Sequence, residues 1–168
     1  MSIDLFGDTF INGHEYARKV VTKSYSLPFY KIQVKKYRSS GQLFENRYDI
    51  RYYNGRERVS LNESGLYAIY RKIGNKMEPL YNGSSDYSMS SRIYRFIKEL
   101  DDASREDETH PGAKKAKRDG IKSSDELYVK VLFKRDFPSE NDIRFPLVEL
   151  DEYIAPLIKS KYNVRIRR

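Results

Sequence analysis

Two short segments, Gly65-Leu66-Tyr67 and Tyr81-Asn82-Gly83, each combine a tyrosine with a glycine on either side of a charged turn, and Arg92 follows them. A phenol near a metal ion or another cation can ionise below its usual pKa of ~10 and accept a proton from water. Arginine can bind phosphate oxygens through two hydrogen bonds and stabilise charge that develops at phosphorus. With a glutamate elsewhere to hold one divalent cation, these residue types could form a site that cleaves phosphodiester bonds.

The elements that position these residues begin with a predicted β-hairpin. Strand-like runs at 65–72 and 77–83 flank residues 73–76, whose Gly-Asn pair is typical of a hairpin turn. Because paired strands lie about 5 Å apart, Tyr67 and Tyr81 are expected to be close on one face. Gly65 and Gly83 should leave room for another backbone or a ligand.

The remainder of this region predicts a helix, a short basic helix, a strand and a second long helix, in that order. Pro156 should kink or restart the last helix, because proline lacks the amide hydrogen that a helix interior needs. The predicted ranges are 88–106, 110–120, 126–134 and 145–163.

The first sixty residues form a basic, tyrosine-rich segment with eleven Lys and Arg against six Asp and Glu. A helix is predicted near 15–21, and alternating runs at 30–37 and 46–53 predict an antiparallel strand pair, followed by a turn at 54–58. One face of this pair should be apolar and the other largely basic. Because a two-stranded ribbon fits a DNA groove, we expect the basic face to contact DNA. The residues concerned are Lys31, Lys35, Arg47 and Arg51.

This order of elements predicts an α+β fold with a small antiparallel or mixed sheet of about three strands flanked by helices. We expect a catalytic domain over residues 61–168. Residues 1–60 should form an N-terminal extension, a helix and a β-hairpin, that contacts DNA or a second subunit.

Composition narrows the class of protein. The 168 residues carry 32 Lys and Arg against 24 Asp and Glu, a net charge of +8, which favours a polyanionic partner. The chain has no cysteine, so disulfides and cysteine-based zinc sites are excluded. The sequence lacks a run of ~20 apolar residues and a signal-peptide pattern, so we expect a soluble, cytoplasmic protein that does not bind membranes.

Residues 65 to 163 resemble the GIY-YIG nuclease superfamily, which is defined by Gly-Ile-Tyr on one strand and Tyr-Ile-Gly on the next. In that family an arginine follows on the first helix, then a glutamate on a later helix and an asparagine near the end. The counterparts here are Gly65-Leu66-Tyr67, Tyr81-Asn82-Gly83, Arg92, a glutamate at 149 or 152, and Asn163.

The resemblance implies a DNA endonuclease that uses one divalent cation, Mg²⁺ or alternatively Mn²⁺. Tyr67 and Tyr81 would be the general base and its supporting hydroxyl, in either assignment. Arg92 would bind the scissile phosphate, and Asn163 would orient the site or the local backbone.

The metal ligand is predicted to be Glu149, with Glu152 as the alternative and Asp151 the least favoured. Glu149 stands fourteen residues before Asn163 and lies nearer the predicted apolar stripe of its helix than Glu152 does. The residues of that stripe are Leu150, Ile154, Leu157 and Ile158.

The sequence departs from the family pattern at two positions. Phe96 stands four residues after Arg92, where many members carry His or Tyr that can exchange a proton; Tyr94 or His110 could substitute for it. Ser84 stands where repair-type members often carry lysine, which weakens the relationship to excision-repair nucleases.

A basic helix face follows the first catalytic helix and is predicted to contact DNA phosphates. Its residues are Lys114, Lys115, Lys117 and Arg118. The expected function is that of a type II restriction endonuclease, in which a homodimer cuts both strands of a symmetric site. The alternatives are a structure-specific or weakly specific repair or phage nicking nuclease, and a non-catalytic DNA-binding module.

Overall fold

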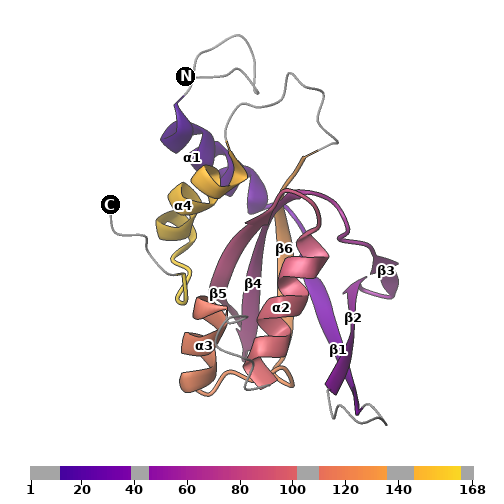
Figure 1. Ribbon diagram of the computed structural model, residues 1–168. Coiled ribbons are helices and arrows are strands. Elements are labelled where there is room, and N and C mark those ends of the chain that lie inside the picture. The colour runs from indigo at the N-terminus through magenta and orange to yellow at the C-terminus, as the bar shows by residue number, and fades with distance from the viewer. Residues whose placement is uncertain (1–11, 39–45, 102–109, 136–145, 164–168) are drawn as a thin grey trace.

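Helices and strands follow one another nearly as the sequence patterns indicate (Figure 1). The computed structural model describes residues 12–38, 46–101, 110–135 and 146–163; residues 102–106 and 145 of the predicted helices lie outside these ranges. The helices are α1 (Gly13–Ser24), α2 (Met89–Asp101), α3 (Pro111–Arg118) and α4 (Leu147–Ile158). The strands are β1 (Tyr30–Arg38), β2 (Asn46–Asn54), β3 (Glu57–Val59), β4 (Gly65–Ile73), β5 (Lys76–Ser85) and β6 (Leu127–Lys134).

All six strands belong to one sheet, in the order β3-β2-β1-β6-β4-β5, and every neighbouring pair is antiparallel. The α+β class is therefore confirmed, but the expected sheet of about three strands is wrong. The difference arises because β1 pairs with β6 through Tyr30↔Val129 and Lys31↔Tyr128, which joins the N-terminal strands to β6, β4 and β5. No local pattern in the sequence reports a pairing over such a separation.

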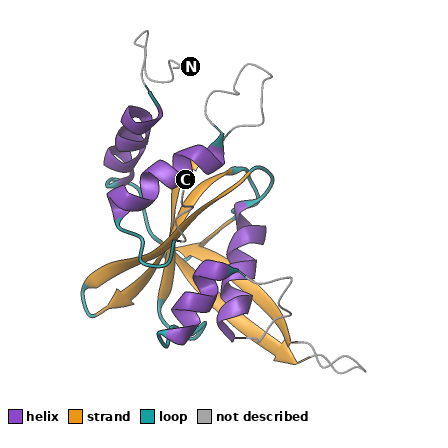
Figure 2. Cartoon of the chain, turned by 60° about the vertical axis from the view of Figure 1, so that its left-hand side comes forward, coloured by secondary structure: helices purple, strands orange, loops and turns teal. Residues whose placement is uncertain are grey.

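The sheet is covered on both faces, with α2 and α3 on one side and α1 and α4 on the other (Figures 1 and 2). Strand β4 contributes to both layers. Its residues Tyr67 and Ile69 belong to the core under α2 and α3, whereas Leu66 and Ala68 face α1 and α4. Because side chains alternate across a strand, a strand with both faces covered is apolar throughout, as the run 65–70 is.

The ribbon of β1 and β2 is amphipathic, as its alternation predicts. Ile32 and Tyr52 pair across the two strands and are buried in the core under α2 and α3. Residues 54–58 were expected to form only a turn, but the turn is shorter than this range. Gly55 adopts a φ of 61°, and β3 already begins at Glu57. A left-handed glycine allows this reversal without a Cβ clash.

The outer edge of β5 is covered by the segment that follows α4. Lys161 N–H donates to Pro79 O at 3.3 Å, and Tyr162 N–H donates to Leu80 O at 2.8 Å. Helix α4 continues past Pro156 and ends at Ile158, where Lys159 adopts a left-handed conformation with φ 57°. This ending turns the chain back toward β5. Within the described ranges, no helix has the length and apolar character needed to cross a membrane.

Candidate functional site

Tyr67 and Tyr81 lie on adjacent strands and on the same side of the sheet. The register pairs Tyr67 with Gly83 and Ile69 with Tyr81, so the two tyrosines are diagonal neighbours rather than directly opposite each other. Their ring centroids are 6.5 Å apart at an interplanar angle of 46°. The hairpin therefore brings the two phenols together, as the spacing of the motif predicts.

Gly83 is required by the ring of Tyr67. A Cβ placed on Gly83 would lie 2.7 Å from Tyr67 Cζ, closer still to the Tyr67 hydroxyl, and 2.9 Å from Tyr81 Cε2. The room expected at this glycine is thus filled by the protein's own phenol. At Gly65 the expectation of another backbone holds, because the space is taken by the carbonyl oxygen of Phe133.

The ring of Tyr81 lies between α2 and α3. Phe96 stacks on it with centroids 5.3 Å apart, and His110 meets it edge-on at 4.7 Å. A Cβ on Gly112 would lie 2.9 Å from the ring of Tyr81, so this glycine lets α3 approach closely. Phe96 thus packs against Tyr81, and the imidazole beside Tyr81 is that of His110, which precedes α3.

His110 is the N-cap of α3, and this role determines which of its ring nitrogens carries the proton. Its Nδ1 accepts a hydrogen bond from Ala113 N–H at 3.2 Å, which leaves Nε2 as the protonated nitrogen of a neutral ring. The pKa of His110 is lowered to about 4, mainly by burial and to a smaller extent by the charges of Arg92 and Arg95, while a backbone hydrogen bond opposes this shift. At neutral pH the imidazole is therefore an uncharged hydrogen-bond donor beside Tyr81. Tyr94, the other residue considered for this role, instead meets Tyr48 edge-on.

Arg92 is exposed on the first turn of α2, and its charge acts on both tyrosines. Burial raises the pKa of Tyr67 well above its usual value and that of Tyr81 to about 12; in both cases Asp151 raises the pKa and Arg92 lowers it. Both phenols are consequently neutral at pH 7 in the protein without ligand. Tyr67 is fully buried, whereas Tyr81 is partly exposed.

On the other face of β5, Asn82 is held by the segment after α4. Asn163 accepts a hydrogen bond from Asn82 N–H at 2.9 Å and donates one to Asn82 O at 2.8 Å. The Asn82 side-chain amide donates to both the backbone carbonyl and the carboxylate of Asp151. Its Oδ1 is buried without a hydrogen-bond partner among the described residues. Asn163 therefore orients the backbone of the second motif.

The carboxylate that acts on the tyrosines is that of Asp151. Burial raises the pKa of Asp151 to about 7, although the hydrogen bond from Asn82 lowers it, and Glu152 adds a further raising effect. Glu149 instead accepts a hydrogen bond from Tyr153 on its own helix at 2.9 Å. Asp151, bound to Asn82 on the other face of β5, thus influences the pKa of both tyrosines, whereas Glu149 is hydrogen-bonded within α4.

A different choice of apolar stripe on α4 would have identified Asp151 from the sequence. The sequence analysis included Leu157 in the stripe, but Leu157 is 38% exposed, whereas Leu147 is buried together with Leu150 and Ile154. Asp151 is four residues after Leu147 and three before Ile154, so it lies on the buried side of the helix.

The basic residues predicted to contact DNA lie on two separate surfaces. Lys31, Lys35, Arg47 and Arg51 share the ribbon face opposite Ile32 and Tyr52, and Arg51 pairs with Asp49 at 3.1 Å. The second group is on α3, the helix that His110 caps. Lys115, Lys117 and Arg118 are exposed there, and Lys114 is partly buried.

Comparison of the chain with protein-family models, with curated proteins and with solved structures gave no significant match. Among the residues that the structure describes, no three or more His, Cys, Asp or Glu side chains gather where they could hold a metal ion. Asp151 and Asn82 bring a carboxylate and a buried amide oxygen together on the other face of β5. Carboxylate and amide oxygens of this kind suit Mg²⁺, which is commonly held by one or two carboxylates, substrate phosphates and water.

The packing of Tyr67 over Gly83 predicts that Gly83→Ala destabilises the hairpin. The added methyl group must displace a buried phenol, so we expect a loss of roughly 1–3 kcal/mol in the free energy of unfolding. Urea unfolding of the variant measures this loss. Ser84→Ala, on the next residue of the same strand, is the matched control; equal stability of wild type and Gly83→Ala would contradict the packing described here.

The burial of Asp151 predicts a specific pH dependence of stability in metal-free buffer. Since burial raises its pKa from 3.8 to about 7, the contribution of neutral Asp151 to stability is fully present below pH ~4 and is lost as the pH rises through 7. Asp151→Asn stays neutral, so it should be more stable than wild type by about 2–4 kcal/mol at pH 8 but not at pH 4. Urea unfolding from pH 4 to pH 8 tests this, with Glu149→Gln as the control on the same helix. Parallel pH profiles of Asp151→Asn and wild type would refute it.

Proposed function

We propose that this protein is a metal-dependent DNA endonuclease that hydrolyses phosphodiester bonds. The observation that carries the proposal is the packing of two phenols together on one β-hairpin, within electrostatic reach of an exposed arginine on α2 and of a desolvated carboxylate on α4. These groups are Tyr67, Tyr81, Arg92 and Asp151. Their residue types match a hydrolytic phosphoryl-transfer site, in which positioning and charge stabilisation supply most of the rate.

Each residue has a distinct part in the proposed reaction. Arg92, exposed at the mouth of the site, binds the scissile phosphate and stabilises the charge that develops on it. One tyrosine, after its own proton has passed to solvent with the help of the positive charge of Arg92, would orient the attacking water and accept its proton as a phenolate, and the second hydroxyl would support the first. His110, neutral and protonated on Nε2, can donate a hydrogen bond to the phosphate or the leaving oxygen.

The carboxylate of Asp151 and the unpartnered Oδ1 of Asn82 would hold the divalent cation. Mg²⁺, when bound, neutralises charge on the phosphate and favours ionised neighbouring groups. This assignment replaces Glu149 as the proposed metal ligand, because Glu149 is engaged with Tyr153. Asn163 supports the site indirectly, by fixing the backbone of Asn82.

The finer proposal is a type II restriction endonuclease that acts on double-stranded DNA as a homodimer in the cytoplasm. The basic ribbon face and the basic face of α3 support binding to duplex DNA. Digestion of a sequenced plasmid with Mg²⁺, followed by mapping of the ends, distinguishes the candidates. Discrete fragments indicate a site-specific enzyme, a ladder indicates a weakly specific nuclease, and intact plasmid indicates a binding module.

The roles of the two phenols and the guanidinium predict the effects of Tyr67→Phe, Tyr81→Phe and Arg92→Ala. Each phenylalanine variant keeps the ring and its packing, so folding should change little, while loss of a general base lowers the rate about 10²- to 10⁴-fold. Arg92→Ala should lose a comparable or larger factor. Single-turnover cleavage at saturating enzyme separates chemistry from DNA binding. If both phenylalanine variants cut at the wild-type rate, the tyrosines serve only packing.

The assignment of the metal-holding group predicts that Asp151→Asn, but not Glu149→Gln, abolishes cleavage and leaves DNA binding intact. A second measurement does not depend on activity. At pH 8 Mn²⁺ should raise the melting temperature of wild type and of Glu149→Gln, but not that of Asp151→Asn. The opposite ranking of the two variants in both assays would return the role to Glu149.

A further inference from the structure

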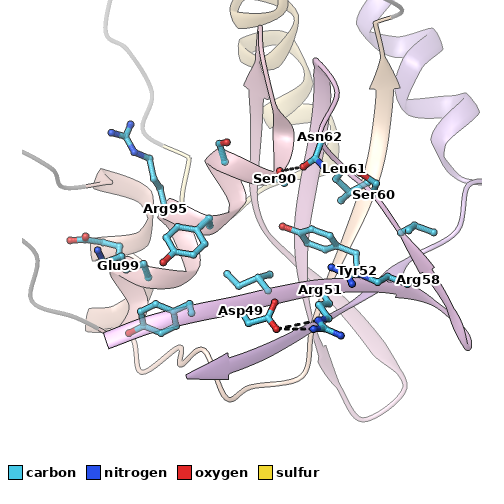
Figure 3. Close-up of a pocket in the computed structure, with 16 residues that line it drawn as sticks. Asp49, Arg51, Tyr52, Arg58, Ser60, Leu61, Asn62, Ser90, Arg95 and Glu99 are labelled. Carbon is cyan, nitrogen blue, oxygen red and sulfur yellow. Dashed lines mark hydrogen bonds and ion pairs between the residues drawn. The ribbon is translucent and has the colours of Figure 1, made fainter. Parts of the chain in front are cut away.

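A groove of about 880 Å³ lies between α2 and the strands β2 and β3, separate from the tyrosine cluster (Figure 3). One side is formed by α2, which carries Arg95 and Glu99, and the other by β2, where Tyr52 faces α2 and the neighbouring Asp49 and Arg51 line the groove from the strand's edge. The segment after β3 closes one end through a hydrogen bond of 2.7 Å from the Ser90 hydroxyl to Asn62 Oδ1. The groove is therefore built by elements far apart in the sequence.

The inner walls of the groove are rigid. Tyr52 and Leu61 are almost completely buried beneath it, and Tyr48 and Tyr94 meet edge-on across it with centroids 6.1 Å apart. Ser90 N–H donates to Leu61 O at 2.8 Å, which ties the start of α2 to the segment after β3. A preformed groove of this kind binds its occupant without a large ordering cost.

The charges that line the groove are mostly positive. Arg58 and Arg95 are exposed and Lys98 is partly exposed, and no ion pair involves any of these three within the described ranges. Of the two acidic residues, Asp49 pairs with Arg51, and Glu99 is only 5% exposed. The groove thus presents cations and hydroxyl groups to an occupant, which are the groups that bind phosphate and sugar oxygens.

Helix α2 carries exposed cations of both the candidate active site and the groove. Arg92 acts on the two tyrosines, and Arg95 acts on His110 while also lining the groove. Arg92, Arg95 and Lys98 are spaced three residues apart, so they advance along the helix axis in steps of about 4.5 Å. A row of cations that begins at the proposed scissile phosphate fits a phosphate backbone better than a folded protein surface.

We propose that this groove binds the sugar–phosphate backbone of the DNA beyond the scissile phosphate, with Arg95 and Lys98 contacting successive phosphates along α2 and Arg58 contacting a phosphate from the β3 rim. The inference rests on the proposed nuclease function, which it deepens by giving the path of the substrate. It also assigns DNA contact to the side of the ribbon that faces α2.

Binding of a labelled DNA duplex, measured by fluorescence anisotropy in EDTA over a range of salt concentrations, tests the proposal. The double variant Arg95→Ala/Lys98→Ala should bind more weakly and show a salt slope smaller by about 2, because each lost phosphate contact removes about 0.9. Lys72→Ala/Lys76→Ala, at the exposed β4–β5 turn, removes the same charge outside the groove and should leave the slope unchanged. Arg58→Ala, on the facing strand, provides an independent test with a slope change of about 1.

Two outcomes overturn the proposal: a wild-type salt slope in both groove variants, or polyglutamate competing as well as DNA for the wild-type groove, which would indicate an acidic protein partner. The nuclease proposal fails separately. If wild type binds duplex DNA but does not cut it with Mg²⁺ or Mn²⁺, the nuclease proposal is wrong, and the salt slopes still show whether the groove contacts DNA.

Discussion

The packing of the Tyr67 ring over Gly83 is the contact on which the arrangement of the site depends. The ring fills the space that a side chain at position 83 would occupy. The position of the Tyr67 phenol on β4 therefore requires a glycine at residue 83 on β5. In this register Tyr81 becomes the diagonal neighbour of Tyr67, and its ring is then enclosed by Phe96 and His110 from the two covering helices. The chemistry of the cluster is thus set by core packing.

The site also depends on the position of β5 at the edge of the sheet. Because β5 has a strand neighbour on only one side, the segment after α4 can hydrogen-bond to its free edge, and Asn163 can bond to both backbone groups of Asn82. The Asn82 side chain then holds Asp151, which comes from the helix layer on the opposite face. At this edge strand, Arg92 from one helix layer and Asp151 from the other can both influence the pKa of Tyr67 and Tyr81.

The pairing of β1 with β6 connects this site to the rest of the molecule. It makes the basic ribbon a continuation of the sheet that carries the tyrosines, so that α2 lies between the candidate site and the groove beside β2. Arg92 and Arg95, one turn apart on α2, therefore face two neighbouring regions. A single rigid helix could in this way position both the scissile phosphate and the adjoining backbone.

Local sequence patterns were sufficient to predict most helices and strands and the proximity of Tyr67 to Tyr81. Period-two alternation identified the ribbon and its apolar face, the Gly-Asn turn identified the hairpin, and helical spacing identified α2, because these features depend on residues close together in the chain. Local patterns did not predict that one sheet holds six strands, that Asn82 binds Asp151, or that His110 meets Tyr81. Each of these depends on contacts between residues distant in the sequence, such as Tyr30 with Val129 and Asn82 with Asn163. Local propensity carries no information about such contacts, since they are stabilised only when separate elements pack together.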